Sequence, residues 1–246
     1  MVYILIICKK NNFLMQKSYF CMEQKYKIMK GSKGSETKMT IREEAFKLFL
    51  TKDFNIVPLK QIERSLNLSR GCMSYHYPTK QELFNDVIDY YILHKQNANN
   101  KMQDAFNLSL LEFIHFYVDK VASTKNEMQQ FLSDDDSNNI TNAYLKLISQ
   151  AECYYPNFKQ IAQEIKQYEV ILFEKIIKRA QEKKEIKPEL DSLLLAQHFR
   201  YLFYGQSYDD ALNNGLDVDR LKKQFMFLYN ICLLYTSPSP RDRSVS

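Results

Sequence analysis

The sequence predicts an all-α protein with two helical domains, and three observations support this prediction. The chain has 246 residues but only five glycines and six prolines, whereas folds with many strands and turns use both residues often. Apolar residues recur at helical spacing along most of the chain. At roughly 150 residues per domain, the length corresponds to between one and two domains. We therefore expect a small helical domain at residues 35–94 and a larger one at residues 95–231.

The two ends of the chain do not follow this helical pattern. Residues 1–34 show no sustained period, and several methionines could be the true start, so we interpret them as a disordered or mis-started leader, with a genuine extra arm as the second interpretation. Residues 232–242 (CLLYTSPSPRD) resemble the translation of a sequencing-library adapter. Residues 232–246 are accordingly predicted to be a foreign tail, and the other interpretation is a natural Ser/Pro-rich tail.

The composition indicates in which cellular compartment the protein works and which kinds of partner it does not bind. The net charge is +5, and no stretch approaches the roughly 20 continuous apolar residues of a membrane span. The cysteines are odd in number, widely spaced and without a Cys-x-x-Cys pair, which argues against a disulfide framework or a cysteine-rich metal site. We expect a cytoplasmic protein with no membrane partner, no metal and no cofactor.

The first domain begins with a helix over residues 35–54. Thr40 and Glu43 form a possible capping box, and Ser35 or Thr37 could equally begin the helix. Pro58 suits the first turn of a second, short helix that ends before Asn67, a residue that tolerates left-handed geometry.

A third helix is predicted at residues 70–77, with Ser69 as its N-cap and Pro78 as its stop. Thr79 and Glu82 form a capping box that opens a long helix through Tyr91. Two short helices joined by a tight turn, with a longer helix before and after them, predict a helix-turn-helix unit.

Such a unit enters the major groove of DNA with the start of its second helix, which must therefore be slim and polar. Residues 69–74 meet this requirement, and the polar side chains that follow them can reach phosphates. The candidate DNA-binding residues are Lys60, Ser69, Arg70, Gly71, Cys72, Ser74, Tyr75, His76, Tyr77 and Lys80. Residues 36–83 carry eight basic and six acidic side chains, so charge adds only weak support.

Residues 41–83 resemble the N-terminal domain of the TetR family of bacterial transcriptional regulators. The resemblance rests on Glu44-Ala-Phe-x-Leu-Phe49, on Ser69-Arg-Gly71 and on Tyr75-His-Tyr-Pro-Thr-Lys-Gln-Glu-Leu83. It implies that Arg70, Cys72, Tyr75, His76 and Lys80 lie at or near DNA. Pro58, Asn67 and Ser74 depart from the family pattern, and Ser74 replaces a frequent tyrosine that donates to phosphate.

Further helices are predicted at residues 108–122, 127–132, 137–154, after Pro156, at 190–212 and at 221–231. The helix after Pro156 and the helix at 190–212 have apolar arcs wider than one core-facing stripe. The resemblance implies a homodimer formed by the last two long helices, which we identify with this pair, whereas on the other interpretation both lie inside one monomer core. The candidate interface residues are Tyr168, Ile171, Leu172, Lys175, Phe199 and Tyr204.

The resemblance also implies a small-molecule effector held inside the larger domain. The candidate lining residues are Phe113, Tyr117, Tyr144, Cys153, His198 and Phe203, each of which could equally be an ordinary core residue.

The function that these patterns predict is a repressor that binds double-stranded operator DNA as a homodimer and is released by an unknown effector. A catalytic role is disfavoured because the four histidines form no metal or nucleophile motif, and Asp134–Asp136 reads as a solvated loop. We therefore name no catalytic residue. The remaining alternative is a helical module that uses its helix-turn-helix for protein contacts.

Overall fold

The computed structural model describes residues 33–94, 105, 107–132 and 139–233. The chain divides into two compact units. The first comprises residues up to Asn97 together with Gln150–Tyr155, and the second comprises Ala98–Ser149 and the residues from Pro156 onward. The described residues form helices throughout, with an isolated bridge between Ile186 and Leu233, which confirms the predicted all-α fold. No helix among these residues is both long enough and apolar enough to cross a bilayer.

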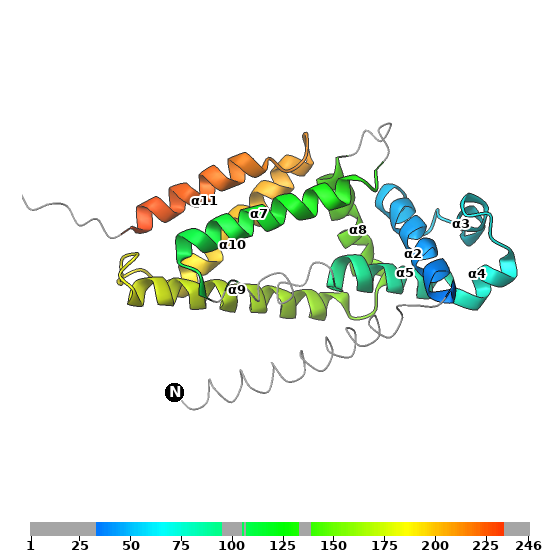
Figure 1. Cartoon of the computed structure of the whole chain (residues 1–246), viewed down its shortest axis with the longest axis horizontal. Helices are drawn as coiled ribbons and strands as arrows, with labels where there is room; N and C mark the ends of the chain where they lie inside the picture. The colour runs from blue at the N-terminus through cyan, green and yellow to red at the C-terminus, as the bar shows by residue number, and fades with distance from the viewer. Residues whose placement is uncertain (1–32, 95–104, 106, 133–138, 234–246) are drawn as a thin grey trace, which may run out of the picture. The chain divides into compact units, whose positions relative to one another are not determined.

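The first unit contains five helical elements: α2 (Lys33–Thr51), α3 (Leu59–Ser65), α4 (Arg70–His76), α5 (Lys80–Val87) and the π-helix η1 (Ile88–His94). Helix α2 packs on α3 and α5, and α3 packs on α4, which is the predicted helix-turn-helix arrangement (Figure 1).

The turns of this unit follow mostly from local sequence. Asn67 takes the left-handed conformation (φ 52°) in the turn between α3 and α4. The Ser69 hydroxyl caps α4 by accepting from the Cys72 N–H at 3.1 Å, and Thr79 and Glu82 form the predicted capping box at the start of α5. Thr40 is not a cap: it lies inside α2, and its hydroxyl donates to the Glu36 carbonyl. The capping-box interpretation at Thr40 was therefore wrong, because the residues before it are already helical.

Aromatic side chains form the core of the first unit. Phe46 and Tyr91 stack with their ring centroids 3.8 Å apart, which joins α2 to η1. Phe49 and Phe54 surround Phe84 of α5 at 5.1 and 4.9 Å. These contacts fix α2 against the helix that follows the helix-turn-helix.

The second unit contains α7 (Leu110–Gln129), α9 (Phe158–Glu182), α10 (Ser192–Ala211) and α11 (Val218–Cys232), together with the first part of α8 (Ile140–Tyr154). Helix α9 packs on α7 and α10, and α11 packs on α7 and α10 (Figure 1). The two helices predicted at 108–122 and 127–132 are one continuous helix, α7, because Ser109 and Glu112 cap its start and no breaker interrupts it.

Some sequence predictions fall outside the described residues, namely those on residues 1–32 and 234–246 and on Asp134–Asp136. Cys232, where the predicted foreign tail begins, is the last residue of α11 and is buried in the core of the second unit.

Candidate nucleic-acid interface

One edge of helix α4, the second helix of the helix-turn-helix, is open to solvent. Ser69, Arg70, Gly71 and Ser74 are exposed, and Tyr75 is 82% exposed. A Cβ atom added at Gly71 would meet only the Ser69 hydroxyl, at 4.0 Å, so packing within the chain does not require glycine here. The small residues instead leave this edge slim, as entry into a DNA groove demands.

The opposite edge of α4 is anchored in the core. Met73 is 1% exposed and Tyr77, one turn later, is 2% exposed. The Tyr77 hydroxyl donates to Asp86 Oδ2 at 2.6 Å. Tyr77 thus belongs to the interior, and we remove it from the candidate contact residues, although the sequence interpretation placed it at phosphate.

Asp86 holds a buried ion pair as well as the Tyr77 hydroxyl. Arg42 Nε lies 2.8 Å from Asp86 Oδ2, and both side chains are almost fully buried. Burial alone would raise the pKa of the Asp86 carboxyl, but Arg42, the Tyr77 hydroxyl and the nearby Lys38 together lower it. An ionised Asp86 therefore ties α2 and α5 to the residue that ends α4.

Lys80 is engaged within the chain. Its Nζ donates to the Phe54 carbonyl at 2.8 Å and lies 4.5 Å from the centre of the Phe54 ring. The ammonium group therefore binds the connection between α2 and α3 in this structure. Lys60, on α3, is exposed.

His76 and Cys72 are half-buried at the side of α4. Partial burial, with a smaller contribution from Lys38, lowers the pKa of the His76 imidazole below its ordinary 6.5. At neutral pH the ring is therefore uncharged and can donate only one hydrogen bond. The Tyr75 and His76 rings meet edge to face at 5.1 Å.

The candidate effector residues separate into three groups. Phe113, Tyr117 and Phe203 contact one another or common neighbours in the aromatic core of the second unit. Burial raises the pKa of Tyr144, and electrostatic interactions with Tyr204 and Glu169 raise it further. Cys153 is exposed and belongs to the first unit, and His198 is exposed on α10.

Sequence reasoning missed a polar cluster in the second unit. Glu169 of α9 accepts from Arg200 Nε at 3.1 Å and from the Tyr204 hydroxyl at 3.0 Å. Burial raises the pKa of the Glu169 carboxyl, against the opposing effect of Arg200. Arg200 and Tyr204 are one turn apart on α10, so they share a face of that helix. In the sequence, this spacing of two polar groups within a largely apolar segment was the signal that could have predicted the cluster.

The candidate dimer residues are not all at the surface. Leu172 and Phe199 lie inside the core formed where α9 packs on α10. Tyr168 is half-buried, Lys175 is exposed, and Ile171 and Tyr204 are 39% and 41% exposed. The wide apolar arcs of α9 and α10 are thus partly explained by contacts within one chain.

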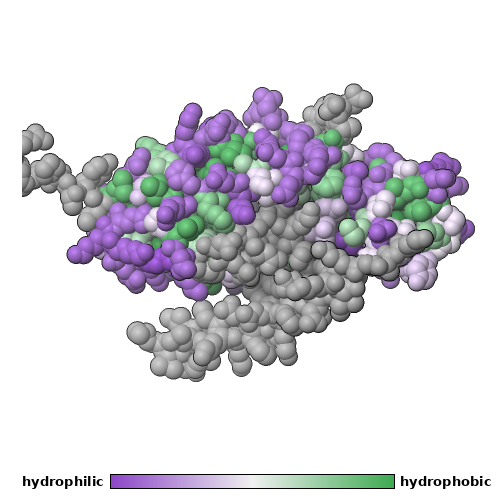
Figure 2. Space-filling model, viewed as in Figure 1, coloured by the Kyte–Doolittle hydropathy of each residue, from purple (hydrophilic) through white to green (hydrophobic). Residues whose placement is uncertain are grey.

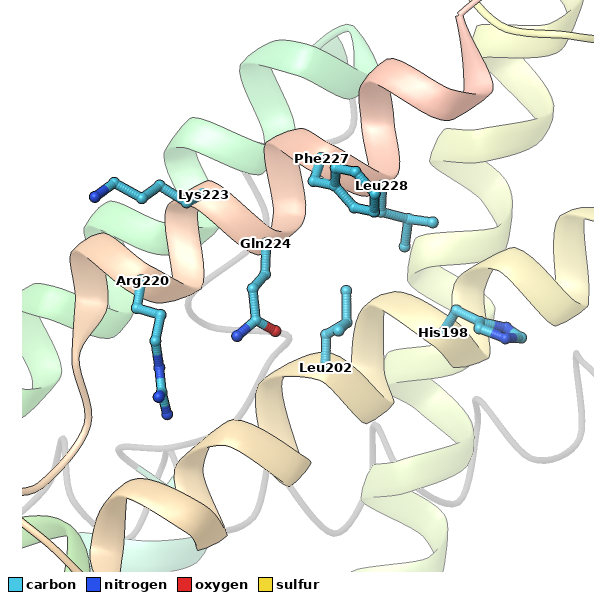
Figure 3. A pocket seen from close by; sticks show the side chains of 7 residues that line it. All are labelled: His198, Leu202, Arg220, Lys223, Gln224, Phe227 and Leu228. Atoms are coloured by element: carbon cyan, nitrogen blue, oxygen red, sulfur yellow. The ribbon is translucent and has the colours of Figure 1, made fainter.

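Helix α10, the residue that follows it, and helix α11 carry most of the large exposed apolar side chains of the second unit. They are Leu193, Leu194, Tyr201, Tyr204, Tyr208, Leu212, Phe227 and Ile231. Figure 2 shows apolar areas among hydrophilic residues over α7 and α11. A shallow pocket of about 370 Å³ lies between α10 and α11, where Leu202 points toward α11 and Gln224 points toward α10 (Figure 3).

Comparison with known proteins identifies the fold. No family model and no curated protein matches the sequence. A TetR-family transcriptional regulator from Cytophaga hutchinsonii superposes with a TM-score of 0.57 and 17% identity, over 84% of this chain and 100% of that one. Regulatory protein TetR from Rhodobacter sphaeroides gives 0.55 and 11%, over 80% and 98%. NalD of Pseudomonas aeruginosa, the secondary repressor of a multidrug efflux pump, gives 0.51 and 16%, over 83% and 99%.

Proposed function

We propose that this chain, which has the fold of TetR-family regulators, is a transcriptional regulator that binds operator DNA through α4. The proposal continues the sequence prediction and is supported by the likeness to solved regulators, NalD among them, which is described as a repressor. By the same reasoning we propose repression, homodimerisation and release by a small effector.

The observation that carries the proposal is the division of α4 into two edges. Met73 and Tyr77 fasten one edge to the core, while Arg70, Ser74 and Tyr75 stand in solvent on the other. A polar outer face is common on surface helices, but here the exposed edge also has small residues and Arg70 at its capped N-terminal end. Contacts to base edges in the major groove require such an edge on a rigid support.

A second copy of the chain is the proposed occupant of the outer face of α10 and α11. Large apolar side chains gather there, and patches of this kind mark interaction sites. A homodimer presents two recognition helices, which can read successive major-groove turns ~34–36 Å apart. We therefore assign the proposed dimer interface to α10 and α11, and no longer to α9 and α10 as in the sequence analysis.

For the effector we propose the region of Tyr117, Tyr144 and Phe203 next to Glu169. Aromatic faces with a few polar groups are typical of small-molecule sites. Effector binding would act by favouring a conformation with lower DNA affinity, and a coupling of about 1–3 kcal/mol changes that affinity roughly 5- to 150-fold.

Selection from random double-stranded DNA tests the proposal directly. We expect enrichment of a sequence with two-fold symmetry. Because Arg70 lies on the edge proposed to contact bases, Arg70→Ala should then weaken binding to the enriched sequence by about 1–3 kcal/mol and relax its sequence preference. Lys166→Ala is the matched control, because Lys166 is an exposed cation on α9. No enrichment by the folded wild-type protein, or equal effects of the two variants, would contradict the proposal.

A further inference from the structure

The end of α8 belongs to the first unit, and its Gln150 side chain bonds the main chain where α2 ends. Gln150 is 9% exposed. Its Nε2 donates to the Phe49 carbonyl at 3.1 Å, and its Oε1 accepts from the Phe54 N–H at 2.8 Å. One amide group thus bridges two main-chain groups that lie about 100 residues earlier in the sequence.

Both main-chain groups depend on Gln150. The Phe49 carbonyl is among the last four of α2, which have no partner inside the helix. Among the described residues, no main-chain N–H donates to it, and no main-chain carbonyl accepts from the Phe54 N–H. Phe49 and Phe54 are buried, so solvent does not replace these bonds.

Neighbouring contacts reinforce the same segment of chain. The Tyr154 ring lies 4.7 Å from the Phe54 ring, and the Tyr154 hydroxyl accepts from Asn55 Nδ2 at 2.5 Å. Gln81 Nε2 of α5 donates to the Tyr154 carbonyl at 2.7 Å. The end of α8 therefore holds the connection from α2 to α3 from one side, while Lys80 holds the Phe54 carbonyl.

We propose that Gln150 is a positioning residue for DNA recognition. It fixes the connection that leads into α3, and α3 is the helix against which α4 packs. Without its two hydrogen bonds, this connection has several accessible conformations, and α4 loses the single placement that base contacts need. The inference rests on the proposed DNA-binding function.

The test compares Gln150→Met with Gln163→Met. Methionine keeps the length of the side chain but removes both hydrogen bonds, and Gln163 is an exposed glutamine on α9. Each protein is titrated, by fluorescence anisotropy, against the sequence enriched by the wild type and against a scrambled duplex.

For Gln150→Met we expect affinity for the enriched sequence to fall at least about tenfold, since unmet buried polar groups are costly. Affinity for the scrambled duplex should stay within about twofold, because exposed side chains supply the phosphate contacts. Gln163→Met should match the wild type on both duplexes. A folded Gln150→Met protein that also matches the wild type, or that loses both affinities equally, would overturn the inference.

Gln150→Glu covers the case in which the methionine variant does not fold. Burial raises the pKa of a carboxyl group, and the protonated group can donate to the Phe49 carbonyl while accepting from the Phe54 N–H. As the pH is lowered from about 8 to about 5, the affinity of Gln150→Glu for the enriched sequence should rise toward that of the wild type measured at the same pH. If the ratio of the Gln150→Glu affinity to the wild-type affinity does not change with pH, the inference is contradicted.

Hydrogen exchange separates this inference from the proposed function. If the wild type enriches no DNA sequence, the proposed function fails. The Phe54 amide should still exchange faster in Gln150→Met or Gln150→Glu than in wild type, and unchanged exchange refutes the bridging role itself.

Discussion

Replacing Asp86 by alanine should destabilise the first unit more than other single changes near α4. The substitution takes the Asp86 carboxylate away from the Arg42 guanidinium at a site where the two side chains are only 4% and 8% exposed. It also removes the closer of the two acceptors of the buried Tyr77 hydroxyl, which keeps only the Lys38 carbonyl at 3.4 Å. The cation–π contact between Arg42 and the Tyr90 ring, at 4.4 Å, remains.

The magnitude follows from burial. Removing one partner of a buried ion pair costs about 3–5 kcal/mol, and solvent screening does not reduce this figure when both groups are so little exposed. The Tyr77 hydroxyl, left with only its longer hydrogen bond to the Lys38 carbonyl, adds up to about 1 kcal/mol. The double variant Arg42→Met/Asp86→Leu removes both charges and should recover most of the loss, since an apolar replacement of similar volume is often neutral.

Urea unfolding followed by circular dichroism at 222 nm measures these differences, because the chain has no tryptophan. We expect a first transition that moves to lower urea in Asp86→Ala and returns toward the wild-type midpoint in the double variant. A loss below about 1 kcal/mol in the single variant, or a double variant less stable than the single one, would refute the reasoning.

Three further predictions concern α4. Ser69→Ala removes the hydroxyl that caps the helix and should cost about 1 kcal/mol in the same unfolding assay, whereas Ser74→Ala, at an exposed position, should cost nothing measurable. Met73→Ala opens a cavity under the helix and should cost about 2–5 kcal/mol; a smaller loss would mean that Met73 does not anchor α4. Because burial lowers the pKa of His76 below 6.5, its charge should strengthen DNA binding only as the pH falls below that value, and His76→Gln should abolish this gain in an anisotropy titration at several pH values.

Acid titration offers an independent check on the Asp86 network. The pKa of Asp86 in the folded chain is lowered from its ordinary 3.8. The stability that its charge provides is therefore complete above this ordinary value and is lost as the pH falls through the folded-state pKa. The unfolding free energy of Asp86→Ala should lack this acid-dependent loss, and an identical acid dependence in the two proteins would argue against the network.

Local sequence predicted the turns of the first unit because their partners are close in the chain. Ser69 and Thr79 bond groups three residues away, and Asn67 needs only its own left-handed conformation. The burial of Tyr77 could also have been predicted, since it lies four residues after Met73 and so shares its face of the helix. Thr40 shows the limit of such signals, because the same spacing occurs inside a helix that has already begun.

Long-range partners could not be predicted in this way. Glutamine is a residue type that is common at exposed positions of helices, so the sequence gives no sign that Gln150 is buried. Its partners Phe49 and Phe54 are about 100 residues away. The apolar arc of α9 and α10 did not reveal whether Leu172 and Phe199 face their own chain or another, because hydrophobic patterning records only that a side chain avoids water.

The placement of Gln150–Tyr155 in the first unit has a consequence for biosynthesis. A ribosome that has released residues 33–97 has not yet made the amide that closes the end of α2. At roughly 5–20 residues per second, the missing segment follows some seconds later. During this interval the first unit of the nascent chain leaves Phe49 and Phe54 without their partners from residues 150–155. A fragment that ends at Asn97 should therefore refold poorly unless a peptide carrying residues 150–155 is added.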